Sequence, residues 1–358
     1  MSGASAAAGD GSGGAARRRE IAVGVIGLGL MGRTHIAAWR AAARAGNACR
    51  VVAVADPSPE RLTGRAAVAG NLPEQAVDEP LFDPRAVRTG TDAATVLDDS
   101  DVEVVSICTP TDTHVDLARR ALERGRHVLV EKPVSLDARA IDDLSATAAR
   151  AGRICMPAMC MRFWPGWSWL REAVRDGRHG AVLSATFQRL GARPAWNPGF
   201  YGDRARSGGA LFDLHVHDAD LVHWLFGPPD SITATGTADH VTALYRYARG
   251  PAHVVLEGGW LGDGGFPFRM RYVVEFERAT AEFDLRREPR LELVAAGRVE
   301  SPTLDDWTGY DGEVRALLDA VRSAEAGALP TLAEAAAVTR SIQAYGLGGL
   351  TTGAAGSR

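Results

Sequence analysis

The stretch EIAVGVIGLGLMGRTHIAAWRAAARAG, residues 20–46, decides the fold of this 358-residue chain. It opens with a short apolar run at residues 21–26, typical of a buried parallel strand, and its alanine-rich second half has helical spacing. Between the two, Gly27, Gly29 and Gly32 form the pattern G-x-G-x-x-G. In a strand–turn–helix, such glycines allow a tight turn, close approach of the backbone to a pyrophosphate, and close packing of the helix. We therefore predict a dinucleotide-binding loop formed by Gly27, Leu28, Gly29, Leu30, Met31 and Gly32.

A second apolar run, residues 51–55, ends in Asp56. An acidic residue at this place binds the ribose hydroxyls in dinucleotide-binding folds, although the spacing here is longer than the usual ~20 residues. The carboxylate would repel a 2′-phosphate. The sequence therefore favours NAD over NADP as the cofactor.

Two further apolar runs lead into polar motifs. Residues 102–108 precede TPTDTH, and the strand within RHVLVEKPVS, residues 126–135, precedes Glu-Lys-Pro. Ligands of open parallel sheets bind beyond the carboxyl ends of the strands. We therefore expect these residues on the same rim as the glycine loop: Thr109, Pro110, His114, Glu131 and Lys132. The alternative for Lys132 is a solvated surface charge, which is the commoner fate of lysine.

Composition limits the class of protein. The chain is 46% hydrophobic and 23% charged, with a formal net charge of -4, which indicates a globular protein without an electrostatic reason to bind nucleic acid. Its apolar runs are too short for a membrane span. Cys49, Cys108, Cys155 and Cys160 lack C-x-x-C spacing. This argues against zinc and against a disulfide framework, and it favours a reducing cytoplasm.

The length predicts two domains, because single domains usually have roughly 100–200 residues. In the second half of the chain, segments such as AVLSATFQRL, AHVVLEGGW, MRYVVEFE and RLELVAA have strand character without intervening helices, which predicts an antiparallel sheet. We expect a Rossmann domain at residues 20–140 and a second α/β domain at residues 141–347. A disordered tail at residues 1–19 and a flexible C-terminus at residues 348–358 complete the predicted organisation.

The segment SGGALFDLHVHDADLVHW, residues 207–224, is rich in histidine and aspartate. Its leucines recur at helical spacing, and on a helix Asp213 and His217 share a face while His215 points nearly opposite. This geometry excludes a metal site made by the H-x-H pattern. Two interpretations stay open: a metal held by Asp213, His217 and a distant ligand, or a helix cap beside a half-buried packing histidine.

Five motifs follow one another in the order seen in the glucose-fructose oxidoreductase / inositol dehydrogenase / MocA family, which this chain resembles over about residues 20–347. They are GVIGLGLMGRTH, VADPSPER, CTPTDTHVDLA, HVLVEKPVS and GGALFDLHVHDADLVHWLFG. The resemblance implies a Rossmann domain followed by an α/β domain with a large, mostly antiparallel sheet. It also implies an NAD-dependent dehydrogenase or reductase of sugars or cyclitols, and a homodimer or homotetramer that pairs through that sheet.

The resemblance implies a catalytic set of Lys132, Asp213 and His217, and no metal. Alcohol oxidation requires removal of the hydroxyl proton, for which a neutral histidine has a suitable pKa, so His217 is the expected general base. Asp213 would orient the imidazole and stabilise its protonated form. Lys132 would hydrogen-bond the reacting oxygen and favour its alkoxide character.

Aromatic and arginine-rich segments suggest where a sugar would bind. We expect substrate contacts from Arg162, Trp196 and Tyr201, because polyol pockets combine the faces of aromatic rings with the guanidinium groups of arginines. Of the Asn-Arg pair often found in the family, only the arginine is present here.

Two rival functions remain: a transient oxidation within a net non-redox hydrolysis or elimination of a glycoside, and a non-catalytic regulator that senses the dinucleotide. Such regulators often lose the lysine and histidine, which this chain retains.

Overall fold

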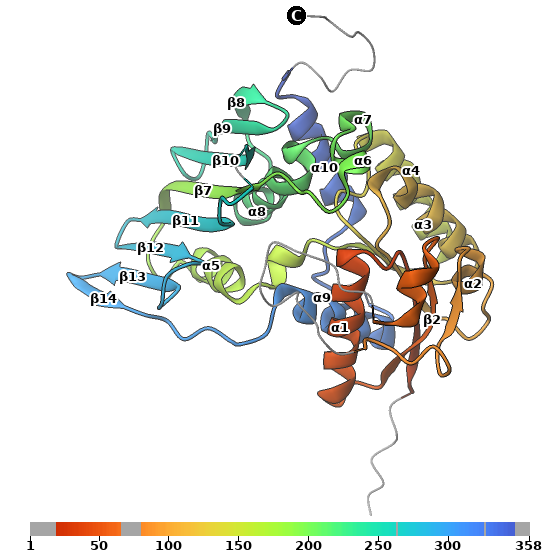
Figure 1. Ribbon diagram of the computed structural model, residues 1–358. Coiled ribbons are helices and arrows are strands. Elements are labelled where there is room, and N and C mark those ends of the chain that lie inside the picture. The colour runs from red at the N-terminus through yellow and green to blue at the C-terminus, as the bar shows by residue number, and fades with distance from the viewer. Residues whose placement is uncertain (1–18, 66–79, 263, 326, 348–358) are drawn as a thin grey trace, which may run out of the picture.

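A computed structural model describes residues 19–65, 80–262, 264–325 and 327–347 (Figure 1). Two sheets lie side by side, with the larger one fanning out from the Rossmann domain, and α10 (Leu332–Gln343) lies between them. The tails predicted at residues 1–19 and 348–358 fall outside the described residues, apart from Arg19.

The first sheet has six parallel strands in the order β3-β2-β1-β4-β5-β6. Its strands are β1 (Ile21–Ile26), β2 (Cys49–Ala55), β3 (Arg88–Gly90), β4 (Val104–Ile107), β5 (His127–Val130) and β6 (Cys155–Pro157). Its helices are α1 (Leu30–Arg44), α2 (Ala94–Leu97), α3 (His114–Glu123) and α4 (Ala138–Ala151). The order places the strand-order switch between β1 and β4, where Rossmann folds bind dinucleotides.

The first domain extends beyond the boundary predicted at residue 140. Strand β6 pairs with β5 in parallel, and α4 connects the two. A parallel pair needs such a crossover, so the unit that contains Glu131 and Lys132 is completed only at Pro157. A boundary at residue 140 would leave this last strand in the second domain.

The second sheet has eight strands in the order β14-β13-β12-β11-β7-β10-β9-β8. Only the pair of β7 and β10 is parallel among its described pairs, so the predicted mostly antiparallel sheet is confirmed. The strands are β7 (Val182–Ala192), β8 (Ser231–Thr237), β9 (His240–Arg246), β10 (His253–Leu261), β11 (Arg269–Phe276), β12 (Ala279–Asp284), β13 (Leu291–Ala295) and β14 (Arg298–Glu300).

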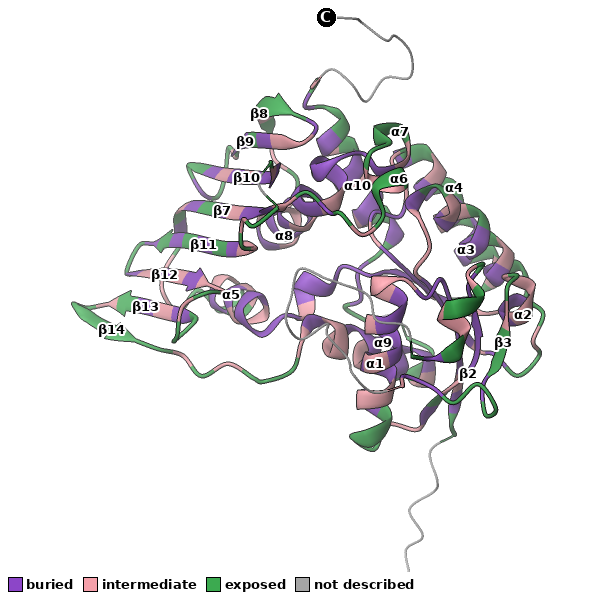
Figure 2. Ribbon diagram, in the orientation of Figure 1, coloured by how far each residue is buried: buried purple, intermediate pink, exposed green. Residues whose placement is uncertain are grey.

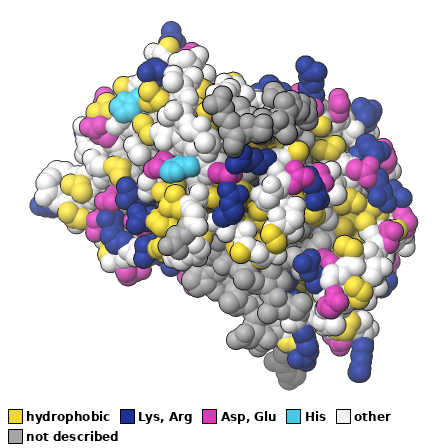
Figure 3. All heavy atoms as spheres, turned by 45° about the horizontal axis from the view of Figure 1, so that its top comes forward, with side chains coloured by type: hydrophobic (Ala, Val, Ile, Leu, Met, Phe, Trp, Pro, Cys, Tyr) yellow, Lys and Arg dark blue, Asp and Glu magenta, His cyan; other side chains and the backbone are white. Residues whose placement is uncertain are grey.

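One face of this sheet packs on helices and the other is open. Burial alternates along β11, and Figure 2 shows the strands striped in the same way. The covered face packs against α5 (Pro165–Asp176) and α8 (Val216–Phe226). On the face shown in Figure 3, acidic and basic side chains are interspersed, in keeping with the small net charge of -4.

The last two described helices return to the Rossmann domain. Helix α9 (Gly309–Ser323) packs against α1, and α10 packs against both α4 and α8. Both helices begin with capping boxes, at Thr308 and Thr331, which satisfy their first N–H groups. The two domains therefore pack against each other through these helices. Within the described residues no helix has the length and apolar character needed to cross a membrane.

Candidate active site

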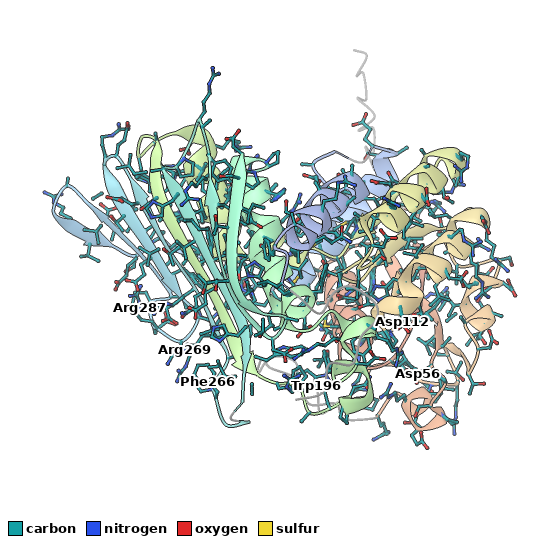
Figure 4. All side chains as sticks on the ribbon, turned by 90° about the horizontal axis from the view of Figure 1, so that it is seen from above. Asp56, Asp112, Trp196, Phe266, Arg269 and Arg287 are labelled. Carbon is teal, nitrogen blue, oxygen red and sulfur yellow. The ribbon has the colours of Figure 1, made fainter. Side chains whose placement is uncertain are left out.

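One cavity of about 810 Å³ runs from the glycine loop to the start of α8. Figure 4 shows Trp196 between the large sheet and the Rossmann domain, with Asp112 and Asp56 on the Rossmann side. The predicted site residues that line the cavity are Gly27, Gly29, Leu30, Met31, Asp56, Thr109, Pro110, His114, Glu131, Lys132, Trp196, Tyr201, Asp213 and His217. A nucleotide and a small polyol together fit a cavity of this size.

The glycine loop has the geometry that its pattern predicts. Gly27 has φ +88°, and a Cβ atom at Gly32 would lie 1.7 Å from the carbonyl oxygen of Gly27. Only glycine therefore fits at both places. Helix α1 begins after Gly29 without a capping side chain or an acidic residue in its first turn. Its first N–H groups are free to bind a pyrophosphate.

Two of the predicted loop residues support the cavity without lining it. The backbone N–H of Leu28 donates to Asp56 Oδ2 at 2.6 Å, and the leucine side chain is buried in the core. Gly32 packs beneath the turn. Neither belongs to the cavity wall.

Asp56 is fixed by its own loop and still lines the cavity. Its Oδ1 accepts the N–H of Ser58 at 2.9 Å, and Arg61 lies 3.3 Å from Oδ2. A carboxylate at the end of β2 fits the ribose hydroxyls of NAD. Arg61 was missed in the sequence analysis, although it closes the motif VADPSPER. The free helix start, the glycine cradle and Asp56 together fit a bound dinucleotide.

His114 clamps two loops together. Its Nδ1 lies 2.9 Å from the carbonyl oxygen of Pro133, and its Nε2 lies 2.8 Å from that of Thr109. Burial lowers the pKa of this imidazole, and the neutral ring donates to one carbonyl at a time. His114 thus joins the loop after β4 to the Glu-Lys-Pro loop, and its nitrogens are engaged with backbone.

Lys132 reaches across the domain interface to Asp213. The lysine Nζ donates to the backbone oxygen of Asp213 at 2.7 Å and lies 3.3 Å from its Oδ1. Trp260 Nε1 donates to the other carboxylate oxygen at 3.2 Å. Trp260 was missed in the sequence analysis because it lies on β10, far from the motifs. The backbone oxygen and Oδ1 of Asp213 therefore hold the lysine, while Trp260 holds the carboxylate through Oδ2.

His217 lies on the cavity wall, but Asp213 does not orient it as expected. The two described residues share no hydrogen bond, and His217 Nδ1 is buried without a partner among the described residues. Burial, with smaller effects from the charges of Lys132 and Arg189, holds the pKa of His217 well below its ordinary value. The imidazole is therefore held in its neutral form.

The helix expected to carry Asp213 and His217 is present, with one irregularity at its start. The predicted helix begins with the π turn η5 (Leu211–His215) and continues as α8. The wider turn alters the angular offset between the two residues, a feature that hydrophobic spacing cannot reveal. His215 points away, and its Nε2 lies 2.7 Å from the hydroxyl of Tyr345. Within the described ranges no group of three or more His, Cys, Asp or Glu side chains could hold a metal ion.

Of the three predicted substrate residues, two line the cavity and one does not. Trp196 and Tyr201 lie on the cavity wall and pack edge to face, with their ring centres 5.8 Å apart. Arg162 lies elsewhere: its side chain is 3% exposed, and it binds Asp220 through two hydrogen bonds of 2.8 and 2.6 Å and Glu334 at 3.0 Å. The structure therefore places Arg162 in a buried ion pair outside the wall of the cavity that Trp196 and Tyr201 line. Asp220, a buried acid on α8, binds the guanidinium, and no sequence motif indicates this pairing.

The fold and the cavity define a two-domain oxidoreductase that binds NAD. The model of the oxidoreductase family with an NAD-binding Rossmann fold matches residues 21–159, and the model of the GFO/IDH/MocA C-terminal domain matches residues 167–282. The chain belongs to this GFO/IDH/MocA family, so the predicted family, fold and cofactor are confirmed.

Three known proteins illustrate the range of its relatives. Inositol 2-dehydrogenase of Rhizobium meliloti (strain 1021) is 29% identical over 345 residues, which cover 89% of this chain and 96% of the relative. A levoglucosan dehydrogenase solved with NADH and levoglucosan has a TM-score of 0.76 at 20% identity, covering 91% and 96% of the two chains. A 2,7-anhydro-N-acetylneuraminate hydratase of Mediterraneibacter gnavus is 33% identical over 152 residues, 41% of this chain and 39% of the hydratase.

Proposed function

We propose that the chain interconverts a secondary hydroxyl and a keto group on a sugar, a sugar derivative or a cyclitol. The observation that carries this proposal is the meeting of Lys132, Asp213 and His217 on the wall of the same cavity as the glycine loop. NAD, when bound, accepts the hydride that leaves the carbinol carbon. The inositol and levoglucosan dehydrogenases among the relatives support the substrate class.

The chain's own groups handle the proton and the oxygen. The neutral imidazole of His217 accepts the hydroxyl proton during oxidation. The Lys132 ammonium donates a hydrogen bond to the same oxygen and stabilises its developing negative charge. Asp213 holds that ammonium in position and is itself held by Trp260. Trp196 and Tyr201 offer aromatic faces to the ring of the substrate.

The test is NADH formation by the purified protein with a panel of sugars, cyclitols and their keto derivatives. His217→Asn is expected to lower kcat by at least about 100-fold, the lower range for loss of a general base, while the Kd for NADH stays within a few fold. His223→Gln on the same helix is the matched control, because His223 lies outside the cavity against Ser341. Equal turnover in wild type and His217→Asn would overturn the assignment.

A second function deserves the same assay, because one relative is a hydratase. In this alternative, the oxidation is transient and reversed within one catalytic cycle, so the net reaction is a hydrolysis or elimination. Consumption of a glycoside or anhydro sugar without accumulation of NADH, and with loss of turnover in His217→Asn, would favour it. Binding of NADH with no conversion of any compound would favour a regulator.

We also propose that the chain forms a homodimer or homotetramer through the open face of the large sheet. Leu183 and Val273 are exposed on neighbouring strands β7 and β11 of this face. Light scattering of wild type and Leu183→Glu measures the assembly, and an unchanged mass would argue against this face.

The four free cysteines favour a reducing compartment such as the cytoplasm.

A further inference from the structure

Two buried arginines bind neighbouring acids on α8, and only one of the two faces the cavity. Arg162 binds Asp220, as described above. Arg189 on β7 binds Asp218 through hydrogen bonds of 3.1 Å from Nε and 2.9 Å from Nη2. The two arginine side chains are 3% and 2% exposed, but Arg189 lines the cavity and Arg162 does not. The pairs are thus alike in chemistry and burial and differ in their access to the cavity.

Arg189 lies on the covered face of the large sheet. Side chains alternate along a strand, so Arg189 points to the same face as the buried Ala185 and Phe187. A charged side chain among apolar neighbours is costly unless its donors are satisfied. The guanidinium lies 6.0 Å from the ring centre of Trp167, and Met270 on β11 is its partner across the sheet. These contacts hold the guanidinium in one place.

One nitrogen of Arg189 lacks an oxygen acceptor. A guanidinium has five N–H donors on three nitrogens, and Asp218 accepts from Nε and Nη2 only. Nη1 lies 2.7 Å from the sulfur of Met270, and a thioether is a weak acceptor. Among the described residues no oxygen accepts from this Nη1. In Arg162 the same nitrogen donates to Glu334 at 3.0 Å, so the arginine outside the cavity has the partner that Arg189 lacks.

The guanidinium of Arg189 lies close to the candidate base. Its partner Asp218 directly follows His217 on α8, and both Arg189 and His217 line the cavity. Burial lowers the pKa of His217, and the charges of Lys132 and Arg189 lower it further, as expected for cations near an imidazole. A donor from the large sheet therefore lies at the end of the cavity that holds the candidate catalytic groups.

The charges at this end favour an uncharged acceptor for Nη1. Lys132 is paired with Asp213, and Arg189 with Asp218. A substrate carboxylate would add a buried charge and compete with Asp218 for the same guanidinium. A hydroxyl accepts a hydrogen bond without adding charge. The acceptor that fits Arg189 is therefore a hydroxyl oxygen.

We propose that Arg189 is a substrate-binding residue, whose Nη1 donates a hydrogen bond to a second hydroxyl of the substrate, other than the one that reacts. The inference rests on the proposed function, which places the reacting hydroxyl beside Lys132 and His217. Two fixed donors then select a neutral polyhydroxylated ring over a simple alcohol or a sugar acid. An analogue without the second hydroxyl is rejected, because the buried donor stays unpaired.

The test is the measurement of kcat and KM with monodeoxy derivatives of the best neutral substrate. In the wild type, one derivative is expected to lose at least about tenfold in kcat/KM. The double variant Arg189→Met/Asp218→Leu removes the donor without leaving a buried acid unpaired. It should raise KM for the parent substrate about tenfold and turn over the parent and that derivative equally, within about twofold. A loss of the same size for the parent and every derivative would mean that Arg189 only supports the fold, and would overturn the inference.

Arg162→Met/Asp220→Leu is the matched control, because it removes a buried pair of the same kind outside the cavity. It should keep the wild-type preference for the parent substrate.

A second variant covers the case in which the double variant fails to fold. Arg189→Lys leaves Asp218 a cationic partner but removes the planar group that carries Nη1, so it should also lose the preference for the second hydroxyl. A retained tenfold preference in this variant, or faster turnover of the matching sugar acid than of the neutral parent by the wild type, would overturn the inference. If the wild type converted no compound, the proposed function itself would fail. Turnover with a preference that does not depend on Arg189 refutes this inference alone.

Discussion

Arg206 binds Asp112 across the mouth of the cavity and so joins the two domains. Its Nε lies 2.8 Å from Asp112 Oδ2, and its Nη2 lies 3.3 Å from Oδ1. Asp112 lines the cavity beside the loop after β4, and Arg206 belongs to the short helix α7 (Arg204–Ser207). The guanidinium also lies over Phe200 of the preceding helix α6 (Pro198–Tyr201), at 5.6 Å from the ring centre. The pair therefore fastens the segment that carries Trp196 and Tyr201 to the Rossmann domain.

Breaking this pair should speed release of the cofactor. The two side chains are 40% and 38% exposed, and exposed pairs contribute only about 0.2–1 kcal/mol. We expect Arg206→Ala to release NADH roughly 1.5- to 5-fold faster in stopped-flow fluorescence, with a smaller difference at 1 M salt. Arg178→Ala is the control, because its exposed partner Asp176 lies outside the cavity. Equal release rates at low salt would contradict the idea that the pair closes the mouth.

Two glycines of the same loop should respond differently to alanine. A Cβ atom at Gly32 would collide with Gly27, so Gly32→Ala is expected to destabilise the fold by about 1–3 kcal/mol and to displace the loop. At Gly29 the nearest atom is 3.9 Å away, on Arg61, so Gly29→Ala should fold normally. It should nevertheless weaken NADH binding by about tenfold, because the pyrophosphate must approach this backbone.

Thermal unfolding and fluorescence titration separate the two effects. Similar losses of stability in both variants would mean that the loop geometry does not distinguish the positions. Full NADH affinity in Gly29→Ala would mean that the cofactor does not approach the loop closely.

Arg162 should matter for stability rather than for substrate binding. Arg162→Met leaves Asp220 buried and unpaired, a change that costs about 3–5 kcal/mol in comparable pairs. The double variant Arg162→Met/Asp220→Leu should regain most of that loss in urea unfolding. The KM of whichever variant remains folded should stay near the wild-type value. A raised KM at unchanged stability would instead return Arg162 to the substrate site.

The Rossmann half was predictable because its signals are local. The turn at Gly27 and the close approach at Gly32 are dictated by adjacent residues, and Asp56 follows directly from the end of β2. Lys132 could be placed on the correct rim for the same reason, since parallel strands end at one edge. The boundary at residue 140 failed because membership of β6 in the sheet depends on pairing rather than on composition.

The contacts that fix the candidate catalytic groups were less predictable because they join distant segments. Trp260 contacts Asp213 from strand β10 of the large sheet, and His35 contacts Glu131 from the first helix. A sequence pattern lists residue types but does not show which of them fold together. The π turn before His217 adds a second difficulty, since one extra residue in a helical turn leaves no mark in the apolar spacing.

Buried and half-buried histidines should make the fold sensitive to mild acid, and the half-buried His223 tests this. Its Nε2 lies 3.1 Å from Ser341 Oγ, and burial, which the charge of Asp220 partly offsets and that of Arg162 reinforces, lowers its pKa to about 4. In the unfolded chain the pKa is about 6.5. The unfolded state therefore binds a proton first as the pH falls, so stability that is fully present above pH 6.5 is lost between about pH 6.5 and 4.

His223→Gln should flatten this pH dependence. Compared with the wild type, the variant is expected to lose about 1–2 kcal/mol less stability between pH 7.5 and 5.0, because one fewer half-buried imidazole must remain neutral. Urea unfolding at the two pH values measures the difference. His253→Gln serves as the control, since His253 is exposed at the start of β10. If His223→Gln and His253→Gln showed the same slope as the wild type, the acid sensitivity would have to come from other groups, foremost His215, whose pKa burial lowers to about 3.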